Sequence, residues 1–180
     1  MKFSFTFNTD FQVIITKRSI MIIKNKNQIL GYLLAAFMLL ALIGSSYFFL
    51  SVMKLGLGEW LAFNACSLSI IVYLICFTCF QVTKKDFFLA IALVPLYYYG
   101  TMGLFLTTWN ADNMFPQITH LIITLNVIWI LFVLLKDSRF ESLGKGLLIG
   151  VLVFVPVFAV IQSYTQIHIA EFMRLLERTV

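Results

Sequence analysis

Five long apolar runs, separated by short polar segments, dominate the pattern of this 180-residue chain. Each run is close to the roughly 20 apolar residues that one helix needs to cross the hydrocarbon core of a bilayer. The predicted helices cover residues 29–53, 60–82, 87–108, 116–135 and 146–164. The sequence therefore predicts an all-α integral membrane protein with about five transmembrane helices, which together form one domain over residues 29–164.

Proline and small residues mark special places inside these helices. Pro95 lies in the middle of the third helix, where the loss of a backbone hydrogen bond predicts a kink. Gly31 and Ala35 in the first helix, and Gly146 and Gly150 in the fifth, have the four-residue spacing that lets a neighbouring helix approach closely. These faces are therefore expected to contact other helices or other subunits.

The N-terminal residues 1–28 differ from the apolar runs. Phe3, Phe5 and Phe7 alternate with polar residues, a period of two that is typical of an extended segment. We therefore expect a short extended N-terminal arm, which lies on the membrane surface with its basic residues near anionic headgroups. The alternative is that translation starts at Met21, which would leave residues 1–20 as a weakly structured extension.

The C-terminal residues 165–180 also have a pattern of their own. Ile169, Phe172, Met173 and Leu176 recur at the three- and four-residue spacing of an amphipathic helix. A helix of this kind favours a position in the membrane interface. Binding of a partner protein is the alternative.

Composition supports the membrane interpretation. Hydrophobic residues make up 61% of the chain and charged residues 12%, against about 45–50% and about 25% in ordinary soluble domains. The net charge is +5, but the basic residues lie in short segments between the apolar runs. Membrane topology explains that placement better than nucleic-acid binding does, so no nucleic-acid partner is predicted.

The basic residues also predict the orientation. If the five helices alternate in direction, ten of the 13 Lys and Arg residues fall on one side of the membrane and three on the other. Basic loops concentrate on the cytoplasmic side. We therefore expect a cytoplasmic N-terminus and a location in the cytoplasmic or inner membrane of the cell.

Polar residues gather near the opposite, outer ends of the predicted helices. Gln117 and His120 share one face of the fourth helix, and Asn64 lies at a similar depth in the second. The sequence predicts a polar pocket open to the outer side and centred on His120, because a histidine can bind, shuttle a proton or ligate a metal. Its other predicted ligand-binding residues are Trp109, Asp112 and Glu59. Further polar residues on this side close the fifth helix: Gln162, Ser163, Gln166 and His168.

A plainer interpretation of these polar residues stays open. Polar side chains near helix ends commonly hydrogen bond a neighbouring helix or a lipid headgroup. Such a hydrogen bond alone can account for the presence of His120. Asn126 lies near the middle of its helix. For this residue we favour an interhelical hydrogen bond, which is worth about 0.6 kcal/mol in membrane proteins. The three consecutive tyrosines at 97–99 cannot all face one way on a helix, so at least one is expected to face lipid.

Other chemistry has less support in the sequence. Cys76 and Cys79 form a CxxC pattern, which can indicate thiol redox chemistry, but an apolar helix disfavours the reactive thiolate. Buried small residues are the interpretation that we favour. The zinc-protease, nucleophile-elbow and P-loop motifs do not occur. No catalytic residue, no cofactor and no metal site is predicted.

Three functions are compatible with these patterns. The first is a non-enzymatic membrane subunit that handles a small molecule, ion or lipid through the polar pocket. The second is a structural or assembly subunit of a larger membrane complex. The third is a membrane enzyme that acts on a lipid through His120 with Asp112 or Glu59, which requires a carboxylate within hydrogen-bond reach of the histidine. The expected partners are membrane lipid and either further copies of the chain or other membrane subunits.

Overall fold

The computed structural model describes residues 27–106, 108–111, 113–136 and 138–179, and this part of the chain forms helices without any strand. Five helical spans are long and apolar enough to cross a membrane, which confirms the predicted multi-pass membrane class. The spans are Asn27–Val52, Ala65–Thr83, Phe87–Leu106, Met114–Lys136 and Phe140–Arg174. The predicted N-terminal arm falls almost wholly on residues 1–26, which lie outside the described residues.

The chain divides into a unit of residues 1–33 and a larger unit of residues 34–180. The described part of the first unit is helical. The hydrophobic core, the glycine contacts of α7 and the ion pair between turns all lie within the second unit. There the first span ends in a π-helical segment, η1 (Tyr47–Val52), and Lys54 follows in the left-handed conformation with a φ of 56°.

The second predicted helix is interrupted at Asn64. Two helices, α2 (Leu57–Phe63) and α3 (Ala65–Thr83), flank this residue, whose φ of −124° and ψ of 62° are not helical. The prediction of one unbroken helix over residues 60–82 is therefore wrong at this position. Asparagine favours such breaks because its side chain competes for the hydrogen bonds that a helix would use.

The third span consists of three pieces. α4 (Phe87–Pro95) passes into the π-helical segment η2 (Leu96–Thr101), which continues as α5 (Met102–Leu106). Pro95 has no N–H to donate, so a backbone hydrogen bond is lost there. The winding changes directly after this proline, and the predicted disturbance of the helix thus takes the form of a π-helical stretch.

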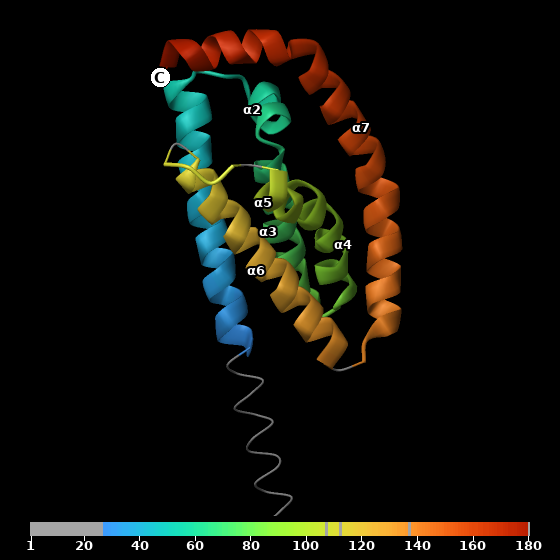
Figure 1. Ribbon diagram of the computed structural model, residues 1–180. Coiled ribbons are helices and arrows are strands. Elements are labelled where there is room, and N and C mark those ends of the chain that lie inside the picture. The colour runs from blue at the N-terminus through green and yellow to red at the C-terminus, as the bar shows by residue number, and fades with distance from the viewer. Residues whose placement is uncertain (1–26, 107, 112, 137, 180) are drawn as a thin grey trace, which may run out of the picture. The chain divides into compact units, whose positions relative to one another are not determined.

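The last two spans are α6 (Met114–Lys136) and α7 (Phe140–Thr179). α6 matches the fourth predicted helix to within two residues. α7 joins two elements that the sequence pattern separates, the fifth helix and the amphipathic C-terminal helix. No glycine or proline lies in residues 157–179 to end it, and α7 curves toward its C-terminal end (Figure 1). The interfacial position of residues 165–180 stays a prediction, and the side chains from 175 onward lie outside the described part.

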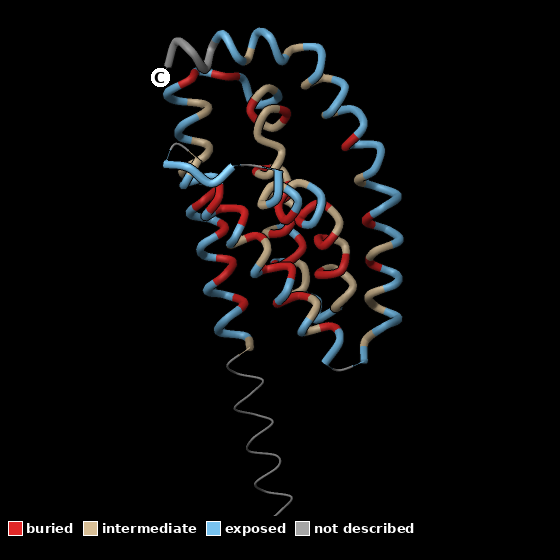
Figure 2. Tube along the Cα trace, in the orientation of Figure 1, coloured by how far each residue is buried: buried red, intermediate tan, exposed pale blue. Residues whose placement is uncertain are grey.

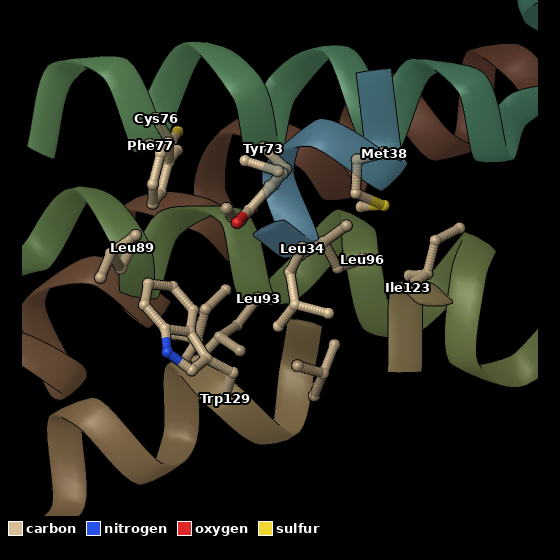
Figure 3. Packing of buried hydrophobic residues seen from close by; sticks show 14 of the residues in the cluster. Leu34, Met38, Tyr73, Cys76, Phe77, Leu89, Leu93, Leu96, Ile123 and Trp129 are labelled. Atoms are coloured by element: carbon tan, nitrogen blue, oxygen red, sulfur yellow. The ribbon is translucent and has the colours of Figure 1, made fainter. Parts of the chain in front are cut away.

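The core lies between α3, α4, η2 and α6, with a contribution from the first span (Figure 3). Tyr73, Leu89, Leu96 and Ile123 are fully buried there. Figure 2 shows the buried residues concentrated where these helices face one another, whereas α7 is mostly exposed. Because lipid is as apolar as these side chains, close van der Waals packing rather than escape from solvent holds such helices together.

Glycines seat α7 against α4. A Cβ atom built on Gly146 would lie 2.5 Å from the carbonyl oxygen of Phe87 and would collide with the Cβ of Ala90. A Cβ atom on Gly150 would lie 3.0 Å from the carbonyl oxygen of Ile91. The small-residue face predicted for this helix therefore packs on a helix of the same chain.

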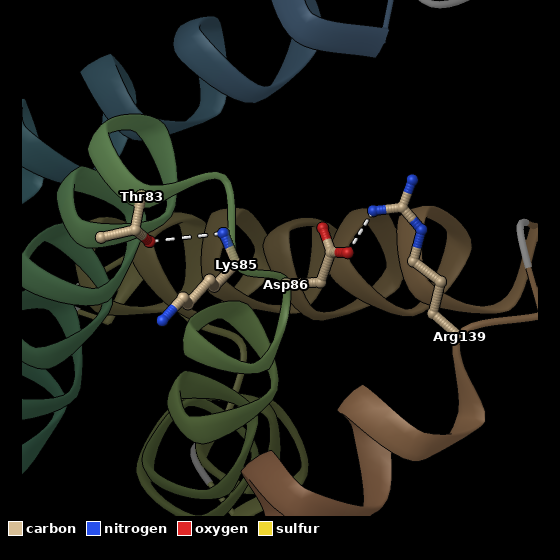
Figure 4. Close-up of polar contacts among 4 residues, drawn as sticks. All are labelled: Thr83, Lys85, Asp86 and Arg139. Carbon is tan, nitrogen blue, oxygen red and sulfur yellow. Dashed lines mark hydrogen bonds and ion pairs between the residues drawn. The ribbon is translucent and has the colours of Figure 1, made fainter.

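An ion pair joins two turns that are far apart in the sequence. Arg139, in the turn between α6 and α7, pairs with Asp86, in the turn between α3 and α4 (Figure 4). In the α3–α4 turn, the backbone N–H of Lys85 donates a hydrogen bond of 3.3 Å to Thr83 Oγ1. The two basic turns therefore lie together at one end of these helices.

Large apolar side chains cover much of the outside of the described helices. Phe105 is 77% exposed, Leu152 67% and Leu40 64%. Soluble monomers rarely expose contiguous apolar surface on this scale. These side chains are placed where lipid tails would surround a membrane protein.

Candidate functional site

Asn64 has its side-chain amide bound at both ends. Its Nδ2 donates to Ser45 Oγ over 2.6 Å, and Trp60 Nε1 donates to the same oxygen over 3.1 Å. Ser45 Oγ also lies 2.9 Å from Ser67 Oγ, and the thiol of Cys66 donates to Asn64 Oδ1. This cluster fastens the break between α2 and α3 to the first span, which gives Asn64 a structural role.

Glu59 and Trp109, two more of the predicted ligand residues, have separate surroundings. Glu59 Oε2 accepts a hydrogen bond of 2.7 Å from the backbone N–H of Gly56, which caps α2 and places a negative charge at its N-terminus. Trp109 is 63% exposed in the segment between α5 and α6. Asp112 lies outside the described residues.

Gln117 and His120 lie on one buried face of α6. Gln117 is 0% exposed and His120 8%. The histidine ring packs on Gly103 of α5: a Cβ atom built on that glycine would lie 2.5 Å from Cε1 and 2.8 Å from each ring nitrogen. One turn further on, Thr124 Oγ1 donates 2.8 Å to the carbonyl oxygen of His120 and lies 3.4 Å from Thr101 Oγ1. Helix packing thus encloses the ring.

The predicted ligand residues are therefore only partly brought together. Gln117 and His120 share a face, whereas no hydrogen bond joins His120 to Asn64 or to Glu59 in the described part of the chain. A ligand-binding role for this set stays a prediction. The lipid-enzyme alternative, which needs a carboxylate beside His120, also stays a prediction.

An apolar groove of about 560 Å³ lies between α4, η2, α6 and α7. Its walls include Leu93, Val127, Leu131, Leu147 and Phe158. A volume of this size is within the range of about 300–1,000 Å³ that is typical of small-molecule sites. We refer to this space as the apolar groove.

A second cavity, of about 380 Å³, lies between α2, α3, η2 and α7. We refer to it as the polar cavity, because Tyr99, Gln162, Thr165 and Gln166 are among its lining residues. The lining also includes Ala62 and Ala65, which flank the helix break at Asn64.

Two polar groups in the lining of the polar cavity differ in their hydrogen bonding. Thr165 Oγ1 donates 3.1 Å to the carbonyl oxygen of Ala62, and so binds a carbonyl close to the break. The hydroxyl of Tyr99 is buried and has no hydrogen-bond partner among the described residues. An unsatisfied buried polar group costs about 1–3 kcal/mol, so this hydroxyl is an unfavourable feature inside the wall of the cavity.

Gln162 belongs to the walls of both the apolar groove and the polar cavity, which therefore adjoin. Its Nε2 donates a hydrogen bond of 2.9 Å to the hydroxyl of Tyr98. Phe158 stacks on the Tyr98 ring at a centroid distance of 4.6 Å and meets the Tyr99 ring edge-on at 4.7 Å. The junction between the two spaces is thus built from η2 and α7.

From the sequence, Gln162 and Gln166 are predicted only as polar residues at the outer end of a helix, without a link to the tyrosines that follow Pro95. Tyr98 and Tyr99 lie three and four residues after Pro95, and they line different spaces. The residues Gln162, Thr165 and Gln166 have the three- and four-residue spacing of one helix face. Together, an aromatic run after a proline and a polar stripe late in an apolar helix would have indicated this region.

The three cysteines, Cys66, Cys76 and Cys79, are free thiols, and in the described part of the chain no group of three or more potential metal-ligating side chains comes together. Comparisons with protein-family models, curated proteins and solved structures found no match to this chain.

Proposed function

We propose that this chain is a non-enzymatic, multi-pass membrane protein that binds an amphiphilic small molecule from the bilayer in the apolar groove and the adjoining polar cavity. The observation that carries the proposal is the pairing of two spaces of opposite character at Gln162. A molecule with a hydrocarbon part and a polar part matches both linings at once. The proposal keeps the predicted handling of a small molecule or lipid and moves the site from His120 to α7.

Irregular backbone at the site supports this proposal. The break at Asn64 and the π-helical segment η2 both border the polar cavity. π-helical segments are found often at functional sites, and non-helical backbone such as that at Asn64 also costs stability and persists where it is useful. Two of them beside one cavity are more than the packing of straight helices requires.

The alternative function, a structural or assembly subunit of a larger complex, has less support than ligand binding. It drew on two small-residue faces as contacts for partner proteins, one with Gly31 and Ala35 and one with Gly146 and Gly150. The second of these faces packs on α4 of the same chain, so it does not argue for a partner. A stable complex with another membrane protein would nevertheless revive this alternative, and the experiment below detects it.

We also propose a cytoplasmic membrane location with the N-terminus inside. Lys84, Lys85, Lys136 and Lys145 surround the turns that the Asp86–Arg139 ion pair joins, and such clusters favour the cytoplasmic side. Single cysteines placed at Lys85 and at Trp109 in a cysteine-free variant test this: a membrane-impermeant thiol reagent added to intact cells should label only the second. The reverse labelling would contradict the orientation.

Native mass spectrometry of the protein purified in a mild detergent tests the binding proposal. We expect a bound molecule of constant mass. In Ala159→Phe, a larger side chain enters the apolar groove, whose wall includes Ala159, so the bound molecule should be lost. Val160→Phe is the matched control, because Val160 is the next residue of α7, is 69% exposed and is not a wall of either space.

Two outcomes would contradict the proposal. One is a wild-type protein without any bound molecule. The other is equal retention of the molecule by the two phenylalanine variants, which would place it elsewhere on the surface. A stoichiometric protein partner in place of a small molecule would favour the assembly subunit.

A further inference from the structure

We infer that the occupant of this site is a long-chain amphiphile with an uncharged, hydrogen-bonding head group, held with its chain in the apolar groove and its head in the polar cavity. This inference rests on the proposed function and goes beyond it by naming the chemical class of the ligand. Three properties of the two linings support this class: their charge, their hydrogen-bonding groups and their length.

The polar cavity has polarity without charge. Its described lining carries a phenol, two amides and a hydroxyl, from Tyr99, Gln162, Gln166 and Thr165, and no acidic or basic side chain. A charged group taken out of water without an opposite charge is very costly, whereas an uncharged hydroxyl or amide costs far less once it is hydrogen bonded. The lining therefore selects against phosphate, carboxylate and ammonium head groups.

The hydrogen-bonding groups in the cavity fit a head group that both donates and accepts. The Tyr99 side chain lines the cavity, but its hydroxyl lies buried inside the wall. The amide of Gln166 offers a carbonyl oxygen and an NH₂ group. The amide nitrogen of Gln162, in contrast, is already engaged with Tyr98. A glycerol, another polyol or a primary amide matches this set, because each can donate and accept at once.

The apolar groove is long. Its walls on α7 run from Leu143 to Gln162, which corresponds to about 28 Å of helix at about 1.5 Å per residue. That length approaches the roughly 30 Å of a bilayer's hydrocarbon core. A long hydrocarbon chain therefore fits the groove better than a compact ring system or a short acyl chain.

Three probes with similar eighteen-carbon chains test the head-group selectivity: monoolein, which is uncharged; oleoyl lysophosphatidic acid, which is anionic; and oleylamine, which is cationic. Each is titrated into the full chain in mild detergent, and binding is followed by native mass spectrometry. We expect monoolein to bind at least tenfold more tightly than either charged probe. Equal or tighter binding of a charged probe would overturn the inference while leaving the proposed function in place.

The experiments distinguish a failure of the head-group inference alone from a failure of the proposed function as well. If none of the three probes binds, but Ala159→Phe still displaces the molecule that co-purifies with the wild type, only the head-group inference fails. If none binds and Ala159→Phe has no effect, the proposed function fails as well.

Variants of the lining provide a second test. Gln166→Leu removes the amide of an exposed residue of the lining, so folding should be preserved while monoolein binding weakens about fivefold. Ser163→Ala, at an exposed site of α7 outside both linings, is the control and should bind as the wild type does. Gln166→Lys adds a positive charge to the lining and should raise the affinity for lysophosphatidic acid about tenfold. Wild-type binding by both lining variants would overturn the inference.

Discussion

The seating of α7 on α4 can be tested with two glycines that lie two residues apart. Gly146 is buried, and a Cβ atom there would meet the Phe87 carbonyl oxygen at 2.5 Å as well as Ala90. Gly144 is exposed, and a Cβ atom there would have no other atom within 4 Å. The substitutions Gly146→Ala and Gly144→Ala therefore differ in what the added methyl group meets.

The expected magnitude follows from a comparison of the two variants. Alanine is favoured over glycine inside a helix by about 1 kcal/mol, and this gain applies to both positions in α7. Gly146→Ala carries an additional cost, because α7 must move away from α4; overpacking of this kind costs about 1–3 kcal/mol. We therefore expect Gly144→Ala to be neutral or stabilising, and Gly146→Ala to be less stable than Gly144→Ala by about 1–3 kcal/mol.

The measurement is the free energy of unfolding in mixed micelles, with a titration of denaturing detergent followed by far-ultraviolet circular dichroism. The difference between the two alanine variants isolates the steric term, since the helix propensity cancels. A difference smaller than about 0.5 kcal/mol, the usual range of neutral surface substitutions, would refute close packing of α7 on α4 at Gly146. It would also mean that α7, which forms one wall of both cavities, lies elsewhere.

Three more predictions concern polar and small residues in the spans. Ser45→Ala removes an oxygen that accepts two hydrogen bonds from side chains and should lower the free energy of unfolding by about 1 kcal/mol. Ser51→Ala, at an exposed site, is the control and should have no effect. Equal free energies of unfolding for the two variants would contradict the hydrogen bonds to Ser45. Gly103→Ala should displace the His120 ring, seen as a shift of the histidine resonances in a nuclear magnetic resonance spectrum, and an unchanged spectrum would refute the contact. Asn126→Leu should change the free energy of unfolding by less than about 1 kcal/mol, because the only described hydrogen bond of this side chain stays within α6. A loss above about 2 kcal/mol would show that the amide is hydrogen bonded to another helix.

The positions of the spans could be predicted because a bilayer demands long apolar runs, which are visible in the sequence without knowledge of the contacts. The break at Asn64 could not be predicted in the same way. An asparagine in an apolar run is compatible with a helix, and what decides here is the acceptor Ser45 Oγ on another span, 19 residues away. Local sequence carries no record of that partner.

The candidate site was harder to predict for a related reason. His120 is the side chain with the most versatile chemistry, but its surroundings depend on Gly103, which leaves just enough room for the ring to be enclosed. The two cavities depend on where α7 crosses the other helices, which Gly146 and Gly150 determine through contacts with α4. The chemistry of the side chains indicated which residues could bind a ligand. The positions of the glycines, which set the distances between helices, decide which of those residues line a cavity.

The π-helical segment η2 has a consequence for how the third span tolerates insertions and deletions. A π-helical stretch carries one residue more than the α-helical path between the same ends. A deletion of one residue within Leu96–Thr101 would therefore let this segment close into an α-helix without turning α5, and Gly103 would still face His120. A deletion of one residue within α4 has no such extra residue to remove, so it would rotate the rest of the span by about 100°. In this span, η2 is the place where one residue can be lost without a change in the angular phase between the two halves.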